Sequence, residues 1–229
     1  MSASGRPVMV VADFDDTLIT VDSLCAMMKK NRWYLDPAMI RAGAGIVFAK
    51  ASGGNELRAR SRFKWLMLRR YHDFPEEEKD AWTAYFRKRF NTGVLGQIRD
   101  LAPEKVIIAS ASDADLIRRV LDGVLSADDI IASVFTEDES SFQTCYGQWK
   151  ADRFAERHPE RTGYHVVVFT DSESDNLTNS GHSIPVIFVA DNEEVGSATM
   201  QGAGSTFLAD TLLRVTSALE VCGAKCDCF

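Results

Sequence analysis

The sequence has no long hydrophobic run and is poor in histidine and cysteine. No stretch approaches the roughly 18 to 20 continuous apolar residues that a membrane-spanning helix needs, and residues 1–7 lack the pattern of a secretory signal peptide. The 229 residues include only four His and five Cys. An odd number of cysteines fits a reducing compartment better than a disulfide framework. We therefore expect a soluble, cytoplasmic protein with no stable membrane anchor.

The cysteines do not form a metal-binding set. Cys222, Cys226 and Cys228 cluster near the C-terminus, but no His or fourth Cys nearby completes a zinc site. Cys226 is fourth from the end, as in a prenylation signal, yet the residues after it fit the aliphatic pair poorly. We expect neither metal nor lipid on this cluster, and we interpret Cys25 and Cys145 as buried thiols.

Positive charge is concentrated in one segment of an acidic chain. The formal net charge of −7 argues against a general nucleic-acid-binding protein. Residues 20–92 hold 15 Lys and Arg against 8 Asp and Glu, whereas the rest of the chain holds 11 against 25. A basic segment within an acidic chain suggests a module that faces something anionic, although a solvated basic helix surface would give the same count.

Hydrophobic patterning divides the chain into an α/β core and a helical insertion. The apolar run Val8–Ala12 is β-branched and short, as expected of a buried strand. Residues 20–92 then carry helix start and stop signals without any alternating apolar pattern. Strands alternate with helices again from Val94 onward, which predicts a three-layer parallel sheet. We therefore assign residues 1–19 and 93–229 to the core and 20–92 to the insertion.

The expected elements can be given in chain order. Helices are predicted in the insertion over residues 24–30, 37–48, 55–71 and 75–90. Further strands are predicted in the core over residues 106–109, 130–135, 165–169 and 185–189. Core helices are predicted over residues 95–101, 113–125, 150–158 and 206–221, and residues 137–149 are expected to form a loop or small hairpin.

Carboxylates follow two of the core strands. Asp13 and Asp15 come directly after the first strand, and Asp171 and Asp175 follow the strand at 165–169. These side chains should converge, because parallel strands place their carboxyl ends at one edge of the sheet. Three or four carboxylates without His or Cys form a hard oxygen-ligand site suited to Mg²⁺.

Two further side chains at this edge can bind a phosphoryl group. Ser110 ends the second core strand and Lys150 follows the third, so a hydroxyl donor and a point charge lie beside the carboxylates. A carboxylate kept ionised by metal and Lys can attack phosphorus, while a second one two residues later acts as acid and then base. The set therefore favours phosphoryl transfer, which depends on positioning and charge stabilisation.

At this point the residues also resemble a known family. Four ordered motifs are similar to those of the haloacid dehalogenase (HAD) superfamily of phosphohydrolases, and within it of the phosphoserine-phosphatase-like subgroup. The motifs are Asp13-Phe14-Asp15-Asp16-Thr17, Ser110 after its strand, Lys150, and Asp171-Ser172-Glu173-Ser174-Asp175. The resemblance covers almost the whole chain. It implies a Rossmann-like core and identifies the insertion as the subgroup's helical cap.

The resemblance also implies roles for individual residues. Asp13 would be the nucleophile, and Asp15 the general acid/base. Ser110 and Lys150 would hold the phosphoryl oxygens of a small phosphomonoester.

The same resemblance implies one Mg²⁺. Its ligands would be Asp13, the backbone carbonyl of Asp15, and Asp171, with Asp175 bound directly or one shell further out. The sequence departs from the family pattern at Asp16 and Thr170, where Gly is usual, so the turn at Asp16 must tolerate a side chain. We expect these changes to tune activity rather than abolish it, since neither position supplies a catalytic group.

Substrate choice is expected to reside in the insertion, because in this superfamily the cap selects the leaving group. The candidate contacts are Arg58, Arg60, Arg62 and Lys64, followed by Asp22. Arg60 and Lys64 are four residues apart on one predicted helix and could face one pocket, and a solvated basic helix face is the alternative. The subgroup includes phosphatases of phosphoserine and of lipid head-group phosphates. The sequence does not predict the oligomeric state.

Three alternatives stay open from the sequence. A phosphotransferase of the same superfamily would use an acceptor other than water. An idle scaffold would bind a partner through its basic cap. A phosphoacceptor signalling domain also uses strand-end Asp residues with magnesium, but it is about half this length and has no helical insertion.

Overall fold

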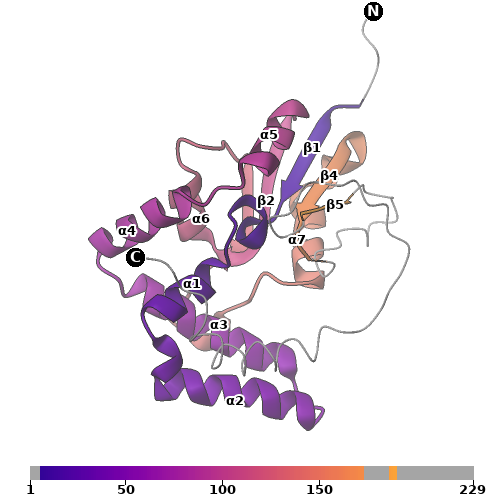
Figure 1. The fold of residues 1–229 in the computed structure, drawn as a ribbon. Coiled ribbons are helices and arrows are strands. Elements are labelled where there is room, and N and C mark those ends of the chain that lie inside the picture. Colours follow the sequence, from indigo (N-terminus) through magenta and orange to yellow (C-terminus); the bar gives the residue numbers. More distant parts are fainter. Residues whose placement is uncertain (1–5, 173–185, 190–229) are drawn as a thin grey trace, which may run out of the picture. The chain divides into compact units, whose positions relative to one another are not determined.

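The structure is a computed structural model that describes residues 6–172 and 186–189, and a parallel five-stranded sheet lies at its centre (Figure 1). The strand order is β3-β2-β1-β4-β5, and each neighbouring pair is parallel. The strands are β1 (Val8–Ala12), β2 (Lys105–Asp113), β3 (Asp129–Ser133), β4 (His165–Thr170) and β5 (Val186–Phe188). This architecture confirms the predicted α/β fold with a parallel sheet.

The central strand β1 is apolar on both faces, and this explains the layers on either side. Met9 and Val11 pack with residues of α7 (Gln148–Arg157), including Phe154. Val10 and Ala12 belong to the opposite core, which includes side chains of α5 (Thr92–Asp100) and α6 (Ala114–Leu121). Successive strand residues point to opposite faces, so one short apolar run nucleates both cores of a three-layer fold.

The predicted insertion between β1 and β2 contains four α-helices, which precede α5. They are α1 (Ser23–Lys30), α2 (Pro37–Ala51), α3 (Glu56–His72) and α4 (Glu76–Arg87). The starts of the first three are fixed by side chains that accept a backbone N–H: Asp22 from Cys25, Asp36 from Ala38, and Asn55 from Arg58. These Asp and Asn side chains satisfy donors that a helix leaves unpaired at its first turn.

The chain enters and leaves the insertion through one short antiparallel pairing. Ile19 pairs with Phe90, Thr20 N–H donates to the Arg89 carbonyl at 2.9 Å, and Asn91 N–H donates to the Leu18 carbonyl at 2.8 Å. The two crossing points therefore lie side by side, close to the predicted boundaries at 19–20 and 92–93.

The insertion is joined to the core by α3 and α4. Trp65 Nε1 donates to the Thr136 carbonyl at 2.8 Å, and His72 Nε2 lies 3.1 Å from the buried Asp113 carboxylate that caps α6. At the other end of α6, the Arg87 guanidinium donates to three backbone carbonyls, those of Arg119, Val120 and Asp122. In contrast, α2 packs on α3 and on the short helix Trp33–Leu35.

The element boundaries differ from the expected ones at several points. β2 continues to Asp113 rather than ending at 109, and α6 ends at Leu121 because Gly123 takes a positive φ of 72°. Residues 137–149 contain one 3-10 turn and no hairpin.

Cys145 is buried as expected, whereas Cys25 is only partly buried. The remaining short helices are Trp33–Leu35, Glu139–Ser141 and Pro159–Gly163, whereas Phe14–Leu18 is a tight turn whose backbone is not helical at Asp15 and Asp16.

Some expectations lie outside the described residues, namely Asp175, the helix at 206–221 and the cysteines at 222, 226 and 228. Among the residues that are described, no helix combines the length and apolar character that a bilayer crossing requires.

The aromatic core of the insertion gives a stability test. Phe86 is fully buried, and its ring stacks on Trp82 with centroids 5.4 Å apart. We expect Phe86→Ala to lower the free energy of unfolding by about 3–5 kcal/mol, because it leaves a cavity in packed surroundings. Urea denaturation measures this change. Phe48→Ala, at a 73% exposed position, is the matched control and should change it by less than about 0.5 kcal/mol. Equal effects of the two substitutions would contradict the packing described.

Candidate active site

Three adjacent strands bring the predicted site residues to one edge of the sheet. Ala12, the last residue of β1, is in register with Ile108 of β2 and Phe169 of β4. The residues that follow are therefore neighbours: Asp13 after β1, Ser110 within β2, and Asp171 directly after β4. The Asp13 N–H also donates to the Phe169 carbonyl at 2.9 Å, which extends the pairing of β1 and β4 by one residue.

Lys150 reaches this edge from α7. Its ammonium nitrogen lies 3.6 Å from Oδ2 of Asp13, and both side chains are largely removed from solvent, with 2% and 13% exposure. Lys150 lies in the first turn of α7, after Gly147, whose positive φ of 56° turns the chain into the helix. A buried charge of this kind requires a charged or hydrogen-bonded partner, and Asp13 is one.

The loop after Asp13 turns sharply. Oδ1 of Asp13 accepts the Phe14 N–H at 2.7 Å, and the Ile19 N–H donates to the Phe14 carbonyl at 3.0 Å. Asp15 keeps an extended backbone, whereas Asp16 has a φ of 52° and a ψ of 8°. This is the left-handed region that favours Gly and tolerates Asp or Asn. The position where the family usually has Gly thus holds one of the few other residues that adopt this conformation readily.

The Asp15 carboxylate faces the start of the insertion. Oδ1 of Asp15 accepts the N–H of Ser23, the first residue of α1, at 2.9 Å. The pKa of Asp15 is raised to about 7, mainly by burial and also by the nearby Asp22 carboxylate, while hydrogen bonds from Ser23 and the charge of Lys64 oppose the increase. Charges from α1 and α3 of the insertion therefore act on a carboxylate of the core.

A pair of buried serines links the insertion to β2. Ser23 Oγ and Ser112 Oγ are 2.8 Å apart and fully buried, and the Ser112 N–H donates to Ser110 Oγ at 3.1 Å. This connection joins Asp15 through Ser23 and Ser112 to Ser110. Sequence reasoning missed the connection between Ser23 and Ser112, because it depends on how α1 docks against the sheet.

The remaining candidates are distributed as follows. Asp22 caps α1, and its charge acts on Asp15, as does that of Lys64. Arg60 forms an ion pair of 2.7 Å with Glu56 on its own helix. The contact of Arg60 with a substrate stays a prediction.

The side chains at this edge are of the type that a hard divalent cation prefers. Asp13, Asp15 and Asp171 offer oxygen ligands alone, from one loop and the end of a neighbouring strand. Within residues 6–172 and 186–189, no three Asp, Glu, His or Cys side chains are gathered closely enough to form a metal cluster. The fourth predicted ligand, Asp175, lies outside this part of the chain.

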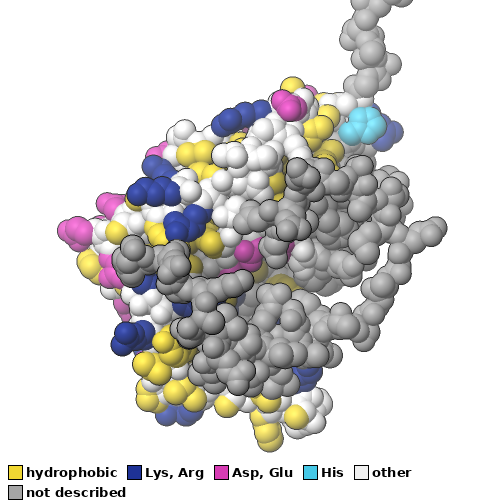
Figure 2. Space-filling view, viewed as in Figure 1, with side chains coloured by type: hydrophobic (Ala, Val, Ile, Leu, Met, Phe, Trp, Pro, Cys, Tyr) yellow, Lys and Arg dark blue, Asp and Glu magenta, His cyan; other side chains and the backbone are white. Residues whose placement is uncertain are grey.

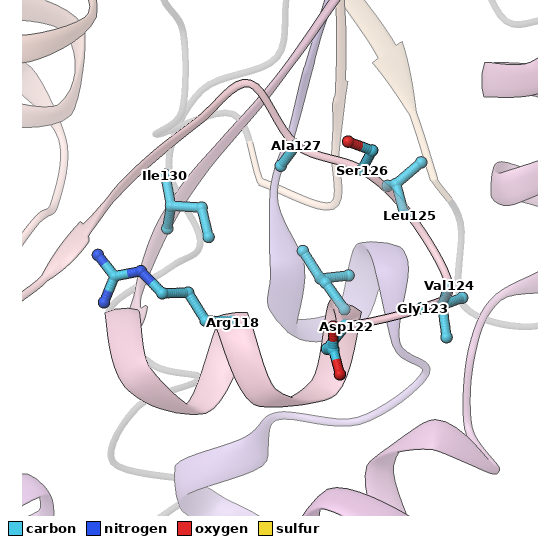
Figure 3. A pocket seen from close by; sticks show the side chains of 9 residues that line it. Arg118, Asp122, Gly123, Val124, Leu125, Ser126, Ala127 and Ile130 are labelled. Atoms are coloured by element: carbon cyan, nitrogen blue, oxygen red, sulfur yellow. The ribbon is translucent and has the colours of Figure 1, made fainter.

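A shallow cavity lies at the opposite edge of the sheet, where β3 begins (Figure 3). It has a volume of about 500 Å³ and is lined by the end of α6 and the loop that follows, from Arg118 to Ile130. It contains none of the predicted site residues.

Comparison with known proteins identifies the family. The family model of haloacid dehalogenase-like hydrolases matches residues 10–176, a range that includes all four motifs. The chain belongs to this family. No curated protein matches the chain significantly in sequence.

Solved structures show that the HAD fold extends over most of this chain. A protein of unknown function from Bordetella pertussis Tohama I is 16% identical with a TM-score of 0.52, over 75% of this chain and 85% of that one. A substrate-bound phosphoserine phosphatase is 12% identical with a TM-score of 0.51, and the match covers 77% of this chain and 82% of the phosphatase. A HAD family hydrolase from Salmonella enterica serovar Typhi is 11% identical with a TM-score of 0.50, and the match covers 75% of this chain and 58% of that hydrolase.

The serine pair predicts energetic coupling between the insertion and the HAD core. Ser23→Ala and Ser112→Ala each leave the other hydroxyl buried with one partner fewer, at a cost of about 1–3 kcal/mol in unfolding free energy. The double variant should be more stable than the sum of the two losses predicts, by about 1 kcal/mol. Urea denaturation of the four proteins measures this coupling.

The control for that cycle pairs Ser23→Ala with Thr83→Ala. Thr83 lies on α4 and donates within that helix to the Lys79 carbonyl at 2.8 Å. The loss of unfolding free energy in the Ser23→Ala and Thr83→Ala double variant should equal the sum of the two single losses to within about 0.5 kcal/mol. Additive losses in the Ser23 and Ser112 pair would contradict the contact.

Proposed function

We propose that this HAD family member is a magnesium-dependent phosphomonoester hydrolase that acts through an aspartyl-phosphate on Asp13. The observation that carries the proposal is the buried ammonium of Lys150 beside the Asp13 carboxylate, at the edge where Ser110 and Asp171 also lie. A nucleophilic carboxylate next to a cation and a hydroxyl donor matches the needs of phosphoryl transfer.

The first half-reaction forms a covalent bond to the enzyme. An Asp13 oxygen attacks phosphorus, the bond from phosphorus to the leaving oxygen breaks, and Asp15 donates a proton to that oxygen. The raised pKa of Asp15, about 7, supports this role because the side chain carries a proton in part of the molecules near neutral pH. Lys150 and the Ser110 hydroxyl hold the other phosphoryl oxygens.

The second half-reaction restores the enzyme. Asp15, now ionised, takes a proton from a water molecule, which attacks phosphorus and releases inorganic phosphate from Asp13. Asp13, the Asp15 carbonyl and Asp171 would hold the magnesium ion, with Asp175 contributing from outside the described residues. When bound, the ion would neutralise negative charge on the phosphoryl oxygens.

The insertion, residues 20–92, is proposed as the cap that selects the substrate. The pairing of its entry and exit points at Ile19 and Phe90 and the nearness of Asp22 and Lys64 to Asp15 support this assignment. The likeness of the fold to a phosphoserine phosphatase makes phosphoserine a first candidate. A lipid head-group phosphate such as phosphatidylglycerophosphate is the second, and a panel containing both tests this choice.

Adding alcohols to the assay separates hydrolysis from phosphotransfer, since a transferase would form the alkyl phosphate.

Two matched variants in one loop test the chemistry. Asp13→Asn should lower magnesium-dependent hydrolysis of an aryl phosphate by at least about a thousandfold, because an amide is a poor nucleophile. Asp16→Asn removes a carboxylate three residues away and keeps a side chain tolerated at positive φ, so it should stay within a few fold of the wild type.

Metal removal completes the assay. Chelation with EDTA should abolish turnover of the wild-type protein, and added Mg²⁺ should restore it. Turnover that survives either EDTA or Asp13→Asn would contradict the proposal, and no turnover of any phosphomonoester would favour an idle scaffold.

A further inference from the structure

Most of the large hydrophobic side chains that are exposed in the described part of the chain lie on one surface. Six large hydrophobic residues are exposed within the described residues, and five of them lie on or beside α2. We name these five the α2 surface: Leu35, Ile40, Val47, Phe48 and Leu57. The sixth, Val134, follows β3 in the core. Isolated exposed hydrophobic residues are ordinary, but a gathered set marks an interaction site.

Helix geometry places the central members of the α2 surface on one stripe. Ile40, Val47 and Phe48 are spaced by seven and eight residues, so they project from the same side of α2. Met39 and Ala42 on the other side are buried. A helix that is apolar on both sides is normally covered on both.

The charged residues of α2 and of the turn after it are all basic. Residues 37–55, which form α2 and the turn after it, contain Arg41 and Lys50 but no Asp or Glu. The acidic residues that flank this segment are already in ion pairs, Asp36 with Arg70 and Glu56 with Arg60. Figure 2 shows hydrophobic and basic side chains together along the lower edge of the molecule, where Figure 1 draws α2. The surface is therefore apolar and cationic.

This combination distinguishes between possible partners. A second copy of the chain docked through the same surface would bring two surfaces of like charge together, which is electrostatically unfavourable. An anionic bilayer offers both a phosphate layer for the cations and an apolar layer for the hydrophobic side chains.

We propose that the α2 surface docks on anionic lipid bilayers. Phe48, Val47 and Ile40 would enter the boundary between head groups and acyl chains, while the exposed Arg41 extends to lipid phosphates. The helix would lie in the plane of the interface and bind reversibly. This inference goes beyond the proposed hydrolase activity and does not depend on it.

Co-sedimentation with vesicles tests the proposal on the full-length protein. We expect binding to vesicles of phosphatidylcholine mixed with phosphatidylglycerol, little binding to phosphatidylcholine alone, and weaker binding at high salt. Phe48→Glu should lower the partition coefficient by about tenfold or more, because it places a charge in the apolar layer. Val134→Glu is the matched control at another exposed hydrophobic position, and it should bind like the wild type.

A second pair of variants tests the charge contribution. Arg41→Glu should reduce binding to the anionic vesicles several fold, whereas Lys88→Glu, at an exposed position beyond α4, should not. Thermal unfolding followed by circular dichroism checks that all four variants are folded.

Several results would overturn the proposal. Failure of the wild type to bind anionic vesicles would do so, as would equal binding to neutral ones or equal losses in the Phe48 and Val134 variants. Sedimentation velocity adds the competing outcome: a dimer that Phe48→Glu dissociates, without any vesicle binding, would assign this surface to a second copy of the chain.

Discussion

The contact between Lys150 and Asp13 is the interaction on which the site depends. Both charges lie at the edge of the sheet with little access to water, 3.6 Å apart. Such a pair contributes little net stability, but removing one partner costs about 3–5 kcal/mol because the other charge stays buried. The two residues come from distant parts of the chain, so the pair forms only when β1 lies at the centre of the sheet and α7 packs across it. The fold thereby holds a cation beside a carboxylate that can attack phosphorus.

The insertion is not an independent appendage to this site. Its first helix places the Ser23 N–H on the Asp15 carboxylate, and the Ser23 hydroxyl contacts Ser112 of β2. Further along, His72 and Arg87 hold the two ends of α6 in the core. These contacts connect the segment that would recognise a substrate with the strands that would carry the chemistry. In contrast, α2 packs on α3 and carries exposed hydrophobic side chains.

The sequence predicts the sheet well because β1, β2 and β4 are continuous apolar runs, and buried parallel strands leave this signal. The position of Asp13, Ser110 and Asp171 at the same edge of the sheet follows from strand direction alone. The contact between Ser23 and Ser112 could not be predicted, since it depends on the docking angle of α1. The exposure of Phe48 could not be predicted either. Residue spacing along α2 shows on which side of the helix Phe48 lies, but it does not show what packs against that side. The pairing of Arg60 with Glu56 was also missed, although a spacing of four residues on a helix indicates it.

The central claim is that Asp13 forms a covalent bond to phosphorus. Rapid acid quenching during turnover, followed by mass spectrometry of the digested protein, tests it most directly. The account predicts that the peptide containing Asp13 gains the mass of one phosphoryl group, loses it on treatment with hydroxylamine, and gains nothing in Asp13→Asn. Turnover with phosphate attached elsewhere, or with no phosphorylated peptide under conditions that trap an acyl phosphate, would contradict it.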